Sequence, residues 1–225
     1  MIRRLALASL LASCILGTSA STLCPPTNTN TAWSAQCFEG QGESRRVKAA
    51  QLGNLKADKT GMTTVLIAEP RELVAVDRSG KVLVSGIVHT GDFDYPTARY
   101  GIGRFTTVTR DASGKPRTQC GYFRVEDFRI LVPASFDQCQ PFKDEQALAC
   151  HGCVAYCTET DCQDRRLVGG TGTLFGTDGK AVRSFELPPL EKVCAAPARA
   201  RIEKLENGAA MLTCPHDPNN PFNKL

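Results

Sequence analysis

Six cysteines lie between Cys120 and Cys162, and they constrain the fold of this chain more than any other feature of its sequence. The chain has 11 cysteines in 225 residues, so more than half of them fall in this single stretch. The residues among them include the apolar segment Ile130-Leu131-Val132, which is typical of a β-strand. Such a density of cysteines predicts a β unit whose core is held by disulfide bonds.

The first 20 residues have the pattern of a secretory signal peptide. Arg3 and Arg4 precede an apolar run from Leu5 to Leu16, and Thr18-Ser19-Ala20 supplies the small residues that a signal peptidase requires. The pattern predicts cleavage after Ala20. The apolar run is shorter than the roughly 20 residues that span a bilayer, and no later segment approaches that length. We therefore expect no transmembrane span.

A second interpretation of the leader is a lipid anchor. Leu11-Ala12-Ser13-Cys14 resembles a bacterial lipobox, and processing there would leave an acylated Cys14 at the N-terminus. The apolar run continues through Ile15 and Leu16, which favours the cut after Ala20. We expect a periplasmic or secreted protein, with an outer-membrane lipoprotein anchored through Cys14 as the alternative.

An even number of cysteines follows the leader, which indicates a disulfide framework formed in an oxidising compartment. The disulfide candidates are Cys24, Cys37, Cys120, Cys139, Cys150, Cys153, Cys157, Cys162, Cys194 and Cys214. Spacing along the chain favours Cys24–Cys37 as a clamp on the N-terminal segment and Cys194–Cys214 as a clamp near the other end. The spacing leaves the remaining connectivity open.

Strand and turn patterns alternate from Val47 onward, and no window of helical length carries a sustained apolar stripe. Gly61 and Gly80 each close a polar turn between apolar runs, and Asn207-Gly208 does the same near the C-terminus. The residues from Val47 to Gly61 therefore predict one strand and its turn. We expect an all-β fold of antiparallel hairpins in a meander, stapled by disulfides. The expected organisation is a leader at 1–20, a disulfide-tied segment at 21–46, a β-repeat domain at 47–190, and a hairpin and tail at 191–225.

The hairpin pattern recurs at intervals of about fifty residues, beginning at Leu73, Gly121 and Thr173. The second unit contains Gly121-Tyr122-Phe123, Ile130-Leu131-Val132-Pro133, Phe136-Asp137 and Pro141-Phe142. These residues resemble the WG repeat of exported bacterial proteins, and Asp77-Arg78-Ser79-Gly80-Lys81 matches the turn of that repeat. Cys120 stands where the repeat has tryptophan. The resemblance covers about residues 73–182; it implies a β-rich scaffold and transfers no catalytic motif.

Cys150-His151-Gly152-Cys153 is a C-x-x-C motif, and a histidine between two sulfurs can lower a thiol pKa. Redox motifs of this type belong to a βαβ setting that this sequence lacks. The same cysteines with Cys157, Cys162 and His151 could hold zinc, but an oxidising compartment favours disulfides over a metal site. We expect structural disulfides here, with no cofactor and no metal.

A segment rich in aromatic and charged residues lies between the first two repeat units. We select six of its residues as candidate binding residues, although ordinary turn and core packing would produce the same composition. They are Asp92, Phe93, Asp94, Tyr95, Tyr100 and Arg104. Asp92 and Asp94 would share one face of a strand, as would Glu159 and Asp161, so a hydrolase with paired carboxylates is an alternative.

The formal net charge of +4 falls to +2 when Arg3 and Arg4 leave with the leader, which does not suggest nucleic acid as a partner. The export signal, the repeated hairpins and the lack of a convergent catalytic set predict a non-enzymatic interaction module of the bacterial cell envelope. Its expected partner is a protein, such as a toxin that it would inhibit, or another envelope component. The alternatives are an envelope hydrolase and a thiol–disulfide oxidoreductase that uses Cys150 and Cys153.

Overall fold

The structure is a computed structural model that describes residues 24–29, 31–89, 91, 93–110, 112–195 and 198–215. The predicted leader, with Cys14 and the cleavage site at Ala20, lies outside the described residues. Within them the regular elements are sixteen strands and five short 3₁₀ helices, which confirms the predicted all-β class. No helix in the described ranges is long and apolar enough to cross a membrane.

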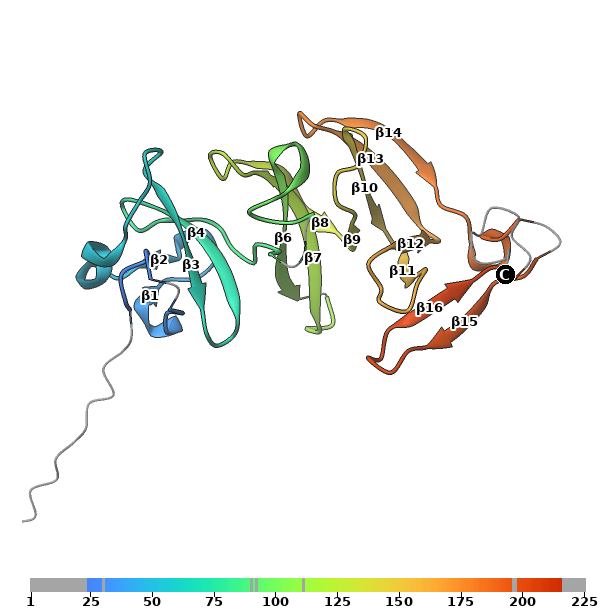
Figure 1. Cartoon of the computed structure of the whole chain (residues 1–225), viewed down its shortest axis with the longest axis horizontal. Helices are drawn as coiled ribbons and strands as arrows, with labels where there is room; N and C mark the ends of the chain where they lie inside the picture. Colours follow the sequence, from blue (N-terminus) through green and yellow to red (C-terminus); the bar gives the residue numbers. More distant parts are fainter. Residues whose placement is uncertain are drawn as a thin grey trace, which may run out of the picture.

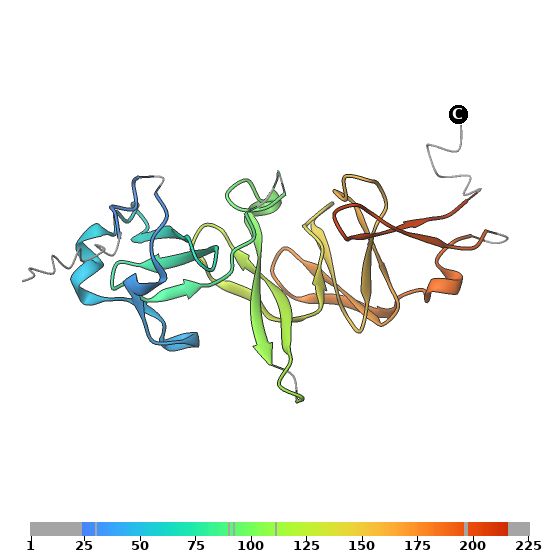
Figure 2. The same ribbon diagram turned by 90° about the horizontal axis from the view of Figure 1, so that it is seen from below.

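Four larger sheets follow one another along the long axis of an elongated molecule (Figures 1 and 2). The first sheet consists of β3 (Met62–Ile67), β4 (Glu72–Asp77) and β5 (Val82–Val84). The second consists of β6 (Ile102–Arg110), β7 (Pro116–Arg124) and β8 (Ile130–Phe136). The third has the order β14 (Ala181–Glu186), β13 (Thr171–Gly176), β10 (Gln146–His151) and β9 (Gln138–Cys139). The fourth has the order β12 (Arg165–Val168), β11 (Val154–Cys157), β16 (Ala210–Thr213) and β15 (Arg201–Lys204).

Four turns share one five-residue frame, in which the amide of the first residue donates to the carbonyl of the fifth and the fourth residue is glycine. In the turn from Asp77 to Lys81, the Asp77 amide donates to the Lys81 carbonyl at 3.0 Å, and Gly80 has φ +81°. Glycine adopts this left-handed conformation without a steric cost, and such a residue after a type I turn closes a hairpin. The four turns are 58–62, 77–81, 176–180 and 205–209. Each predicted Gly-containing turn is therefore confirmed.

The three predicted repeat hairpins are β4–β5, β7–β8 and β13–β14, and all three pair antiparallel. Each is extended to three strands by an antiparallel strand that precedes it in the chain, namely β3, β6 and β10. The turn of the middle hairpin has Phe128 in the left-handed region with φ +51°, and the Asp127 carboxylate accepts the Arg129 amide. This unit therefore lacks the glycine turn of the other two.

The N-terminal segment packs on one face of the first sheet. Trp33 is 1% exposed and lies in one buried cluster with residues of β3 and β4, such as Ile67 and Val74. The segment contributes 3₁₀ helices at Ala35–Cys37, Gly42–Ser44 and Ala49–Asn54, with β1 (Phe38–Glu39) paired to β2 (Arg46–Val47). The predicted boundary between residues 46 and 47 falls inside this packed layer.

The strand predicted between Val47 and Gly61 is wrong for most of its length. Residues Ala49–Asn54 form a 3₁₀ helix instead, in which the Leu55 amide donates to the Leu52 carbonyl at 3.0 Å. Leu52 and Leu55 pack against the Trp33 cluster. Burial of these leucines against a tertiary core overrides the local strand propensity of the sequence.

The third and fourth sheets are joined by one long hairpin that bends in its middle. Strand β10 pairs with β13 in the third sheet, and β11 pairs with β12 in the fourth. The hairpin from 146 to 176 therefore contributes its outer strands to one sheet and the strands near its tip to the other. Gly152, Gly169 and Gly170 occupy the bend with φ between +65° and +71°. A Cβ on Gly170 would lie 2.0 Å from the His151 carbonyl oxygen, so only glycine allows the two strands to turn together.

Five disulfide bonds connect the ten cysteines from Cys24 to Cys214. The pairs are Cys24–Cys37, Cys120–Cys139, Cys150–Cys153, Cys157–Cys162 and Cys194–Cys214. The predicted disulfide framework and both predicted terminal clamps are confirmed. A framework of this extent is typical of an oxidising compartment outside the cytoplasm.

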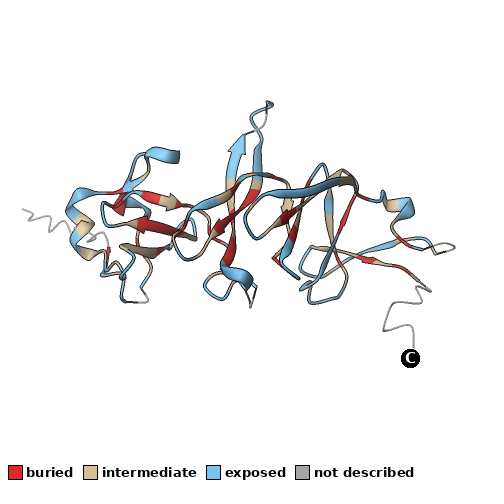
Figure 3. Ribbon diagram, turned by 90° about the horizontal axis from the view of Figure 1, so that it is seen from above, coloured by how far each residue is buried: buried red, intermediate tan, exposed pale blue. Residues whose placement is uncertain are grey.

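Strand β7 is buried on both faces where the second sheet meets its neighbours (Figure 3). Tyr122 and Phe123 are each 0% exposed, and adjacent residues of a strand point to opposite faces. Tyr122 lies in a cluster with Phe142 and Phe175 of the third-sheet region, whereas Phe123 lies in a cluster with Ala75 of the first sheet. These two side chains therefore anchor the second sheet to the sheets on either side.

Alkaline pH should destabilise the protein through Tyr122. Burial raises the pKa of this phenol above its ordinary value of 10.0, and its hydroxyl donates to the Gln140 carbonyl at 2.8 Å. The unfolded chain releases the phenol proton near pH 10 while the folded chain retains it, so stability falls as pH rises above about 10. Denaturant titrations between pH 8 and 11 should show a steeper loss in the wild type than in Tyr122→Phe. Equal pH dependence in the two proteins would contradict this assignment.

Candidate functional site

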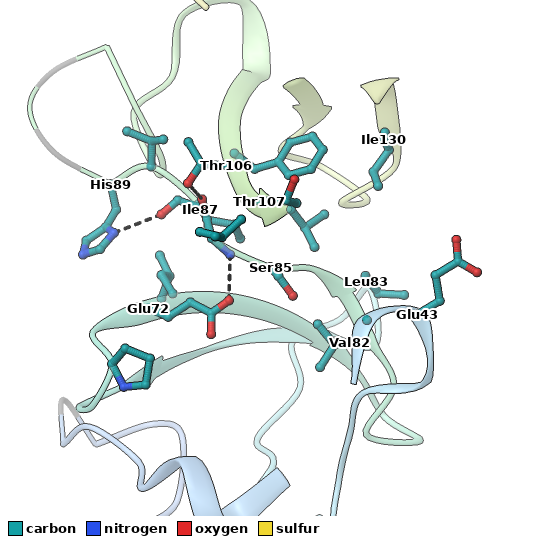
Figure 4. A pocket seen from close by; sticks show the side chains of 18 of the residues that line it. Glu43, Glu72, Val82, Leu83, Ser85, Ile87, His89, Thr106, Thr107 and Ile130 are labelled. Atoms are coloured by element: carbon teal, nitrogen blue, oxygen red, sulfur yellow. Dashed lines mark hydrogen bonds between the residues drawn. The ribbon is translucent and has the colours of Figure 1, made fainter. Parts of the chain in front are cut away.

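A groove of about 900 Å³ lies between the first and second sheets. One wall comes from β5 and the loop after it, and the other from β6 (Figure 4). Its apolar lining includes Leu73, Leu83, Ile87, Phe105 and Val108. A concave surface of this size with a mainly apolar lining is typical of a binding site.

The segment from Gly86 to Val88 holds the two walls in place. Its Ile87 amide donates to the Leu73 carbonyl of the first sheet at 2.9 Å. On its other edge, the Val88 amide donates to the Arg104 carbonyl and the Gly86 carbonyl accepts the Thr106 amide, both at 2.9 Å. Ile87 pairs with Phe105 in an antiparallel bridge. The groove is therefore bounded by backbone that is fixed to both sheets.

Two ionisable groups of the groove, those of Glu72 and His89, are engaged in structural hydrogen bonds. Glu72 accepts from the Arg45 guanidinium at 2.7 Å and from the Gly86 amide at 3.1 Å. The His89 Nδ1 lies 3.1 Å from the Ile87 carbonyl oxygen (Figure 4). This arrangement places no nucleophile beside a base among the described lining residues.

Two large apolar side chains on the groove are exposed to solvent. Val108 on β6 is 71% exposed, and Ile130 at the start of β8 is 45% exposed. Exposed apolar side chains are ordinary when scattered singly, but these two both line the same groove. Neither residue is among the candidate binding residues predicted from the sequence.

Two of the predicted binding residues, Asp94 and Arg104, form a buried ion pair. The Arg104 Nε donates to Asp94 Oδ1 at 2.9 Å and its Nη2 donates to Asp94 Oδ2 at 2.8 Å. The Arg104 Nη1 donates to the Cys139 carbonyl at 2.8 Å, and Asp94 is 1% exposed. This pair ties the loop before β6 to the second sheet and leaves little of the Asp94 carboxylate open to a partner.

The other predicted binding residues occupy mixed positions. Tyr95 packs near Phe128 in the buried cluster between the first two sheets, with ring centroids 5.8 Å apart. Phe93 is 36% exposed, with the Arg99 guanidinium 4.5 Å from its ring centroid, and Tyr100 is 50% exposed. Asp92 lies outside the described residues. Only Phe93 and Tyr100 of this set therefore offer an exposed surface among the residues described.

The C-x-x-C motif lies at the bend of the long hairpin, where Cys150 is fully buried and bonded to Cys153. His151 stacks on Phe136 with ring centroids 4.4 Å apart. Asp137 accepts from the Gly152 amide at 2.7 Å. Burial opposes ionisation of Asp137, but hydrogen bonds from Arg117 and this amide outweigh it and lower its pKa. This disulfide therefore cross-links the bend of the long hairpin.

The cysteines proposed as zinc ligands are consumed in the pairs Cys150–Cys153 and Cys157–Cys162. Among the described residues, no group of three or more His, Cys, Asp or Glu side chains is placed to hold a metal ion. Glu159 and Asp161 are exposed on the loop that the Cys157–Cys162 disulfide closes. The Asp161 carboxylate accepts the Gln163 amide at 3.3 Å, which is a local turn contact.

No protein-family model, curated protein or solved structure matches this chain.

Proposed function

We propose that this protein is a non-enzymatic interaction module of the bacterial periplasm or cell exterior, built from WG-like β units. The groove between the first and second sheets is its binding site, and a protein or an envelope polymer is its partner. The observation that carries this proposal is the exposure of Val108 and Ile130 on one apolar groove whose backbone is fixed on both sides. A preformed apolar surface binds without a large ordering cost.

The arrangement of charges supports binding over catalysis at this groove. Glu72 is held by Arg45 and by the Gly86 amide, so its carboxylate is not poised as a general acid or base. Asp94, one of the paired carboxylates proposed for a hydrolase, is enclosed with Arg104. Cys150 is buried and Cys153 is partly buried, so an external thiol has access to this disulfide only at Cys153. These contacts favour the interaction module over the hydrolase and the oxidoreductase.

A charge placed on the groove should weaken binding. We expect Ile130→Asp to reduce capture of cross-linked envelope proteins or of purified peptidoglycan by about tenfold or more, because an apolar partner would bury an unpaired carboxylate. Val182→Asp is the matched control, since Val182 is 57% exposed on β14 in the third sheet. Quantitative mass spectrometry of captured proteins and a sedimentation assay with the glycan measure the effect.

Equal capture by Ile130→Asp, Val182→Asp and the wild type would show that the groove is not the binding site. Release of soluble glycan from peptidoglycan by the wild type would instead favour the hydrolase. Parallel assays on Asp94→Asn would then report whether that carboxylate takes part.

A further inference from the structure

The second half of β6 has a free backbone edge. On one side, β6 pairs with β7 along its whole length, from Ile102 opposite Arg124 to Arg110 opposite Pro116. On the other side, the segment Gly86–Val88 pairs only with residues 104–106. Residues 107–110 have no neighbouring strand on that side among the described residues.

Gly86 is the first residue of the chain after β5 that lies on this edge. The residue has φ +61°, and a Cβ there would lie 2.1 Å from the Thr106 carbonyl oxygen. Glycine is therefore required at the point where the chain, coming from β5, meets the edge of β6. The next positions along the edge are left open beside the groove, and Thr106, Thr107 and Val108 line it.

The open positions present main-chain hydrogen-bonding groups. In an antiparallel ladder, the amide and carbonyl of one residue point to the same side, and the side alternates along the strand. The Thr106 amide bonds Gly86 and the Arg104 carbonyl bonds Val88, so even-numbered residues of β6 point away from β7. The backbone groups of Val108 and Arg110 therefore point toward the open edge. Unpaired edge groups of this kind are a template for another strand.

We propose that the β6 edge from Thr106 to Arg110 accepts an extended peptide segment of a partner protein as an added antiparallel strand. This inference rests on the proposed binding function of the groove and names the chemistry of its partner. Gly86–Val88 already occupies the same edge in the antiparallel sense, so the added strand continues a pairing that the chain itself makes. Strand addition of this type draws affinity from the backbone and specificity from alternate side chains.

The side chains around the edge define the peptide further. Because the side chains of a strand alternate between two faces, only alternate residues of the peptide meet the apolar groove on the side of Phe105 and Ile130, and the residues between them lie on the face of Val108. Arg110 is exposed and forms no ion pair with any described residue. The antiparallel direction places the N-terminal end of the peptide beside Arg110. The peptide is therefore apolar at alternate positions and acidic at its N-terminal end.

Proline at position 108 tests the edge without disrupting the sheet. The Val108 amide points away from β7, so Val108→Pro removes the hydrogen-bond donor offered to a peptide and keeps the ladder to β7. Val108→Thr is the matched control, because it retains both the amide and a β-branched side chain. Thermal unfolding of the two variants verifies that they remain folded.

A displayed library of random dodecapeptides, panned on the wild-type protein, supplies the probe. We expect selected peptides to bind Val108→Thr nearly as well as the wild type and Val108→Pro about tenfold more weakly, the effect of one lost main-chain hydrogen bond. Hydrogen exchange should show the Val108 and Arg110 amides slowed in the complex. Methylation of alternate peptide amides should abolish binding, since the side chains are unchanged and only the backbone pairing is lost.

Equal binding to Val108→Pro and the wild type, with loss on Ile130→Asp, would overturn strand addition and leave the proposed groove function standing. Binding unaffected by both changes would overturn both. A library without binders would overturn the peptide assignment. Concentration-dependent dimers that Val108→Pro abolishes would overturn it as well, since they would assign the edge to a second copy of this chain.

Discussion

Replacing Asp94 with asparagine should lower the free energy of unfolding by about 3 kcal/mol, because the partly buried Arg104 then lacks its counter-ion. Asp94 is 1% exposed and accepts two hydrogen bonds from the Arg104 guanidinium. The asparagine keeps the shape of the side chain but not its charge. Arg104 retains one bond to the Cys139 carbonyl, and its side chain is 23% exposed, which keeps the expected cost near the lower end of the range for such pairs.

Arg117→Met serves as the control for the Asp94 experiment. Arg117 pairs with Asp137 near the surface, with 48% of its side chain exposed, and such pairs contribute about 1 kcal/mol or less. The double variant Asp94→Leu/Arg104→Met should recover much of the lost stability, since it removes both buried charges together. Urea unfolding measures all three differences. A cost below about 1 kcal/mol for Asp94→Asn would show that the pair does not hold the loop.

The turns of this fold follow from the sequence because local chemistry decides them. Gly80 and Gly208 stand where the backbone needs a positive φ, and Asp77 accepts the Ser79 and Lys81 amides within the same turn. Short-range contacts of this kind act in an isolated segment as well as in the folded chain. The disulfide framework is predictable for a related reason, since an even cysteine count after a leader indicates pairing.

Other elements depend on contacts that the sequence does not reveal. The 3₁₀ helix Ala49–Asn54 forms because Leu52 and the neighbouring Leu55 pack on the Trp33 cluster, and the local pattern predicted a strand there. The bent hairpin needs Gly152 and Gly170 to approach each other across two strands that are distant in sequence. Strand pairing alone shows that this bend is a corner shared by two sheets.

The candidate site also depends on contacts that the sequence does not reveal. The segment that contains Asp94 and Arg104 is rich in aromatic and charged residues, which predicted a binding surface there. In the structure the two side chains instead pair with each other. Val108 stands among threonines, so no apolar pattern marks it, and Ile130 belongs to an apolar run that predicts burial. Their exposure depends on which edge of β6 remains unpaired and on how the first two sheets meet.

Truncation of Phe123 to alanine should have a comparable or larger effect, about 3 to 5 kcal/mol, and should act at the junction of the first two sheets. Phe123 is 0% exposed, and its ring centroid lies 5.8 Å from that of Phe128 and 6.4 Å from that of Phe105. Ala75 of the first sheet belongs to the same buried cluster. Loss of the ring therefore removes part of the packing that couples the first sheet to the second.

The sequential arrangement of sheets makes this prediction specific, because each sheet contacts mainly its neighbours along the axis (Figure 1). In Phe123→Ala, unfolding followed through the fluorescence of Trp33, which is buried on the first sheet, should separate from unfolding followed by far-ultraviolet circular dichroism. Val182→Ala, at an exposed position, should leave the two transitions coincident. Gly103→Ala provides an independent approach, since a Cβ there would lie 2.5 Å from the Phe123 ring and displace it. Coincident transitions in both Phe123→Ala and Gly103→Ala would show that the first two sheets unfold together without this contact.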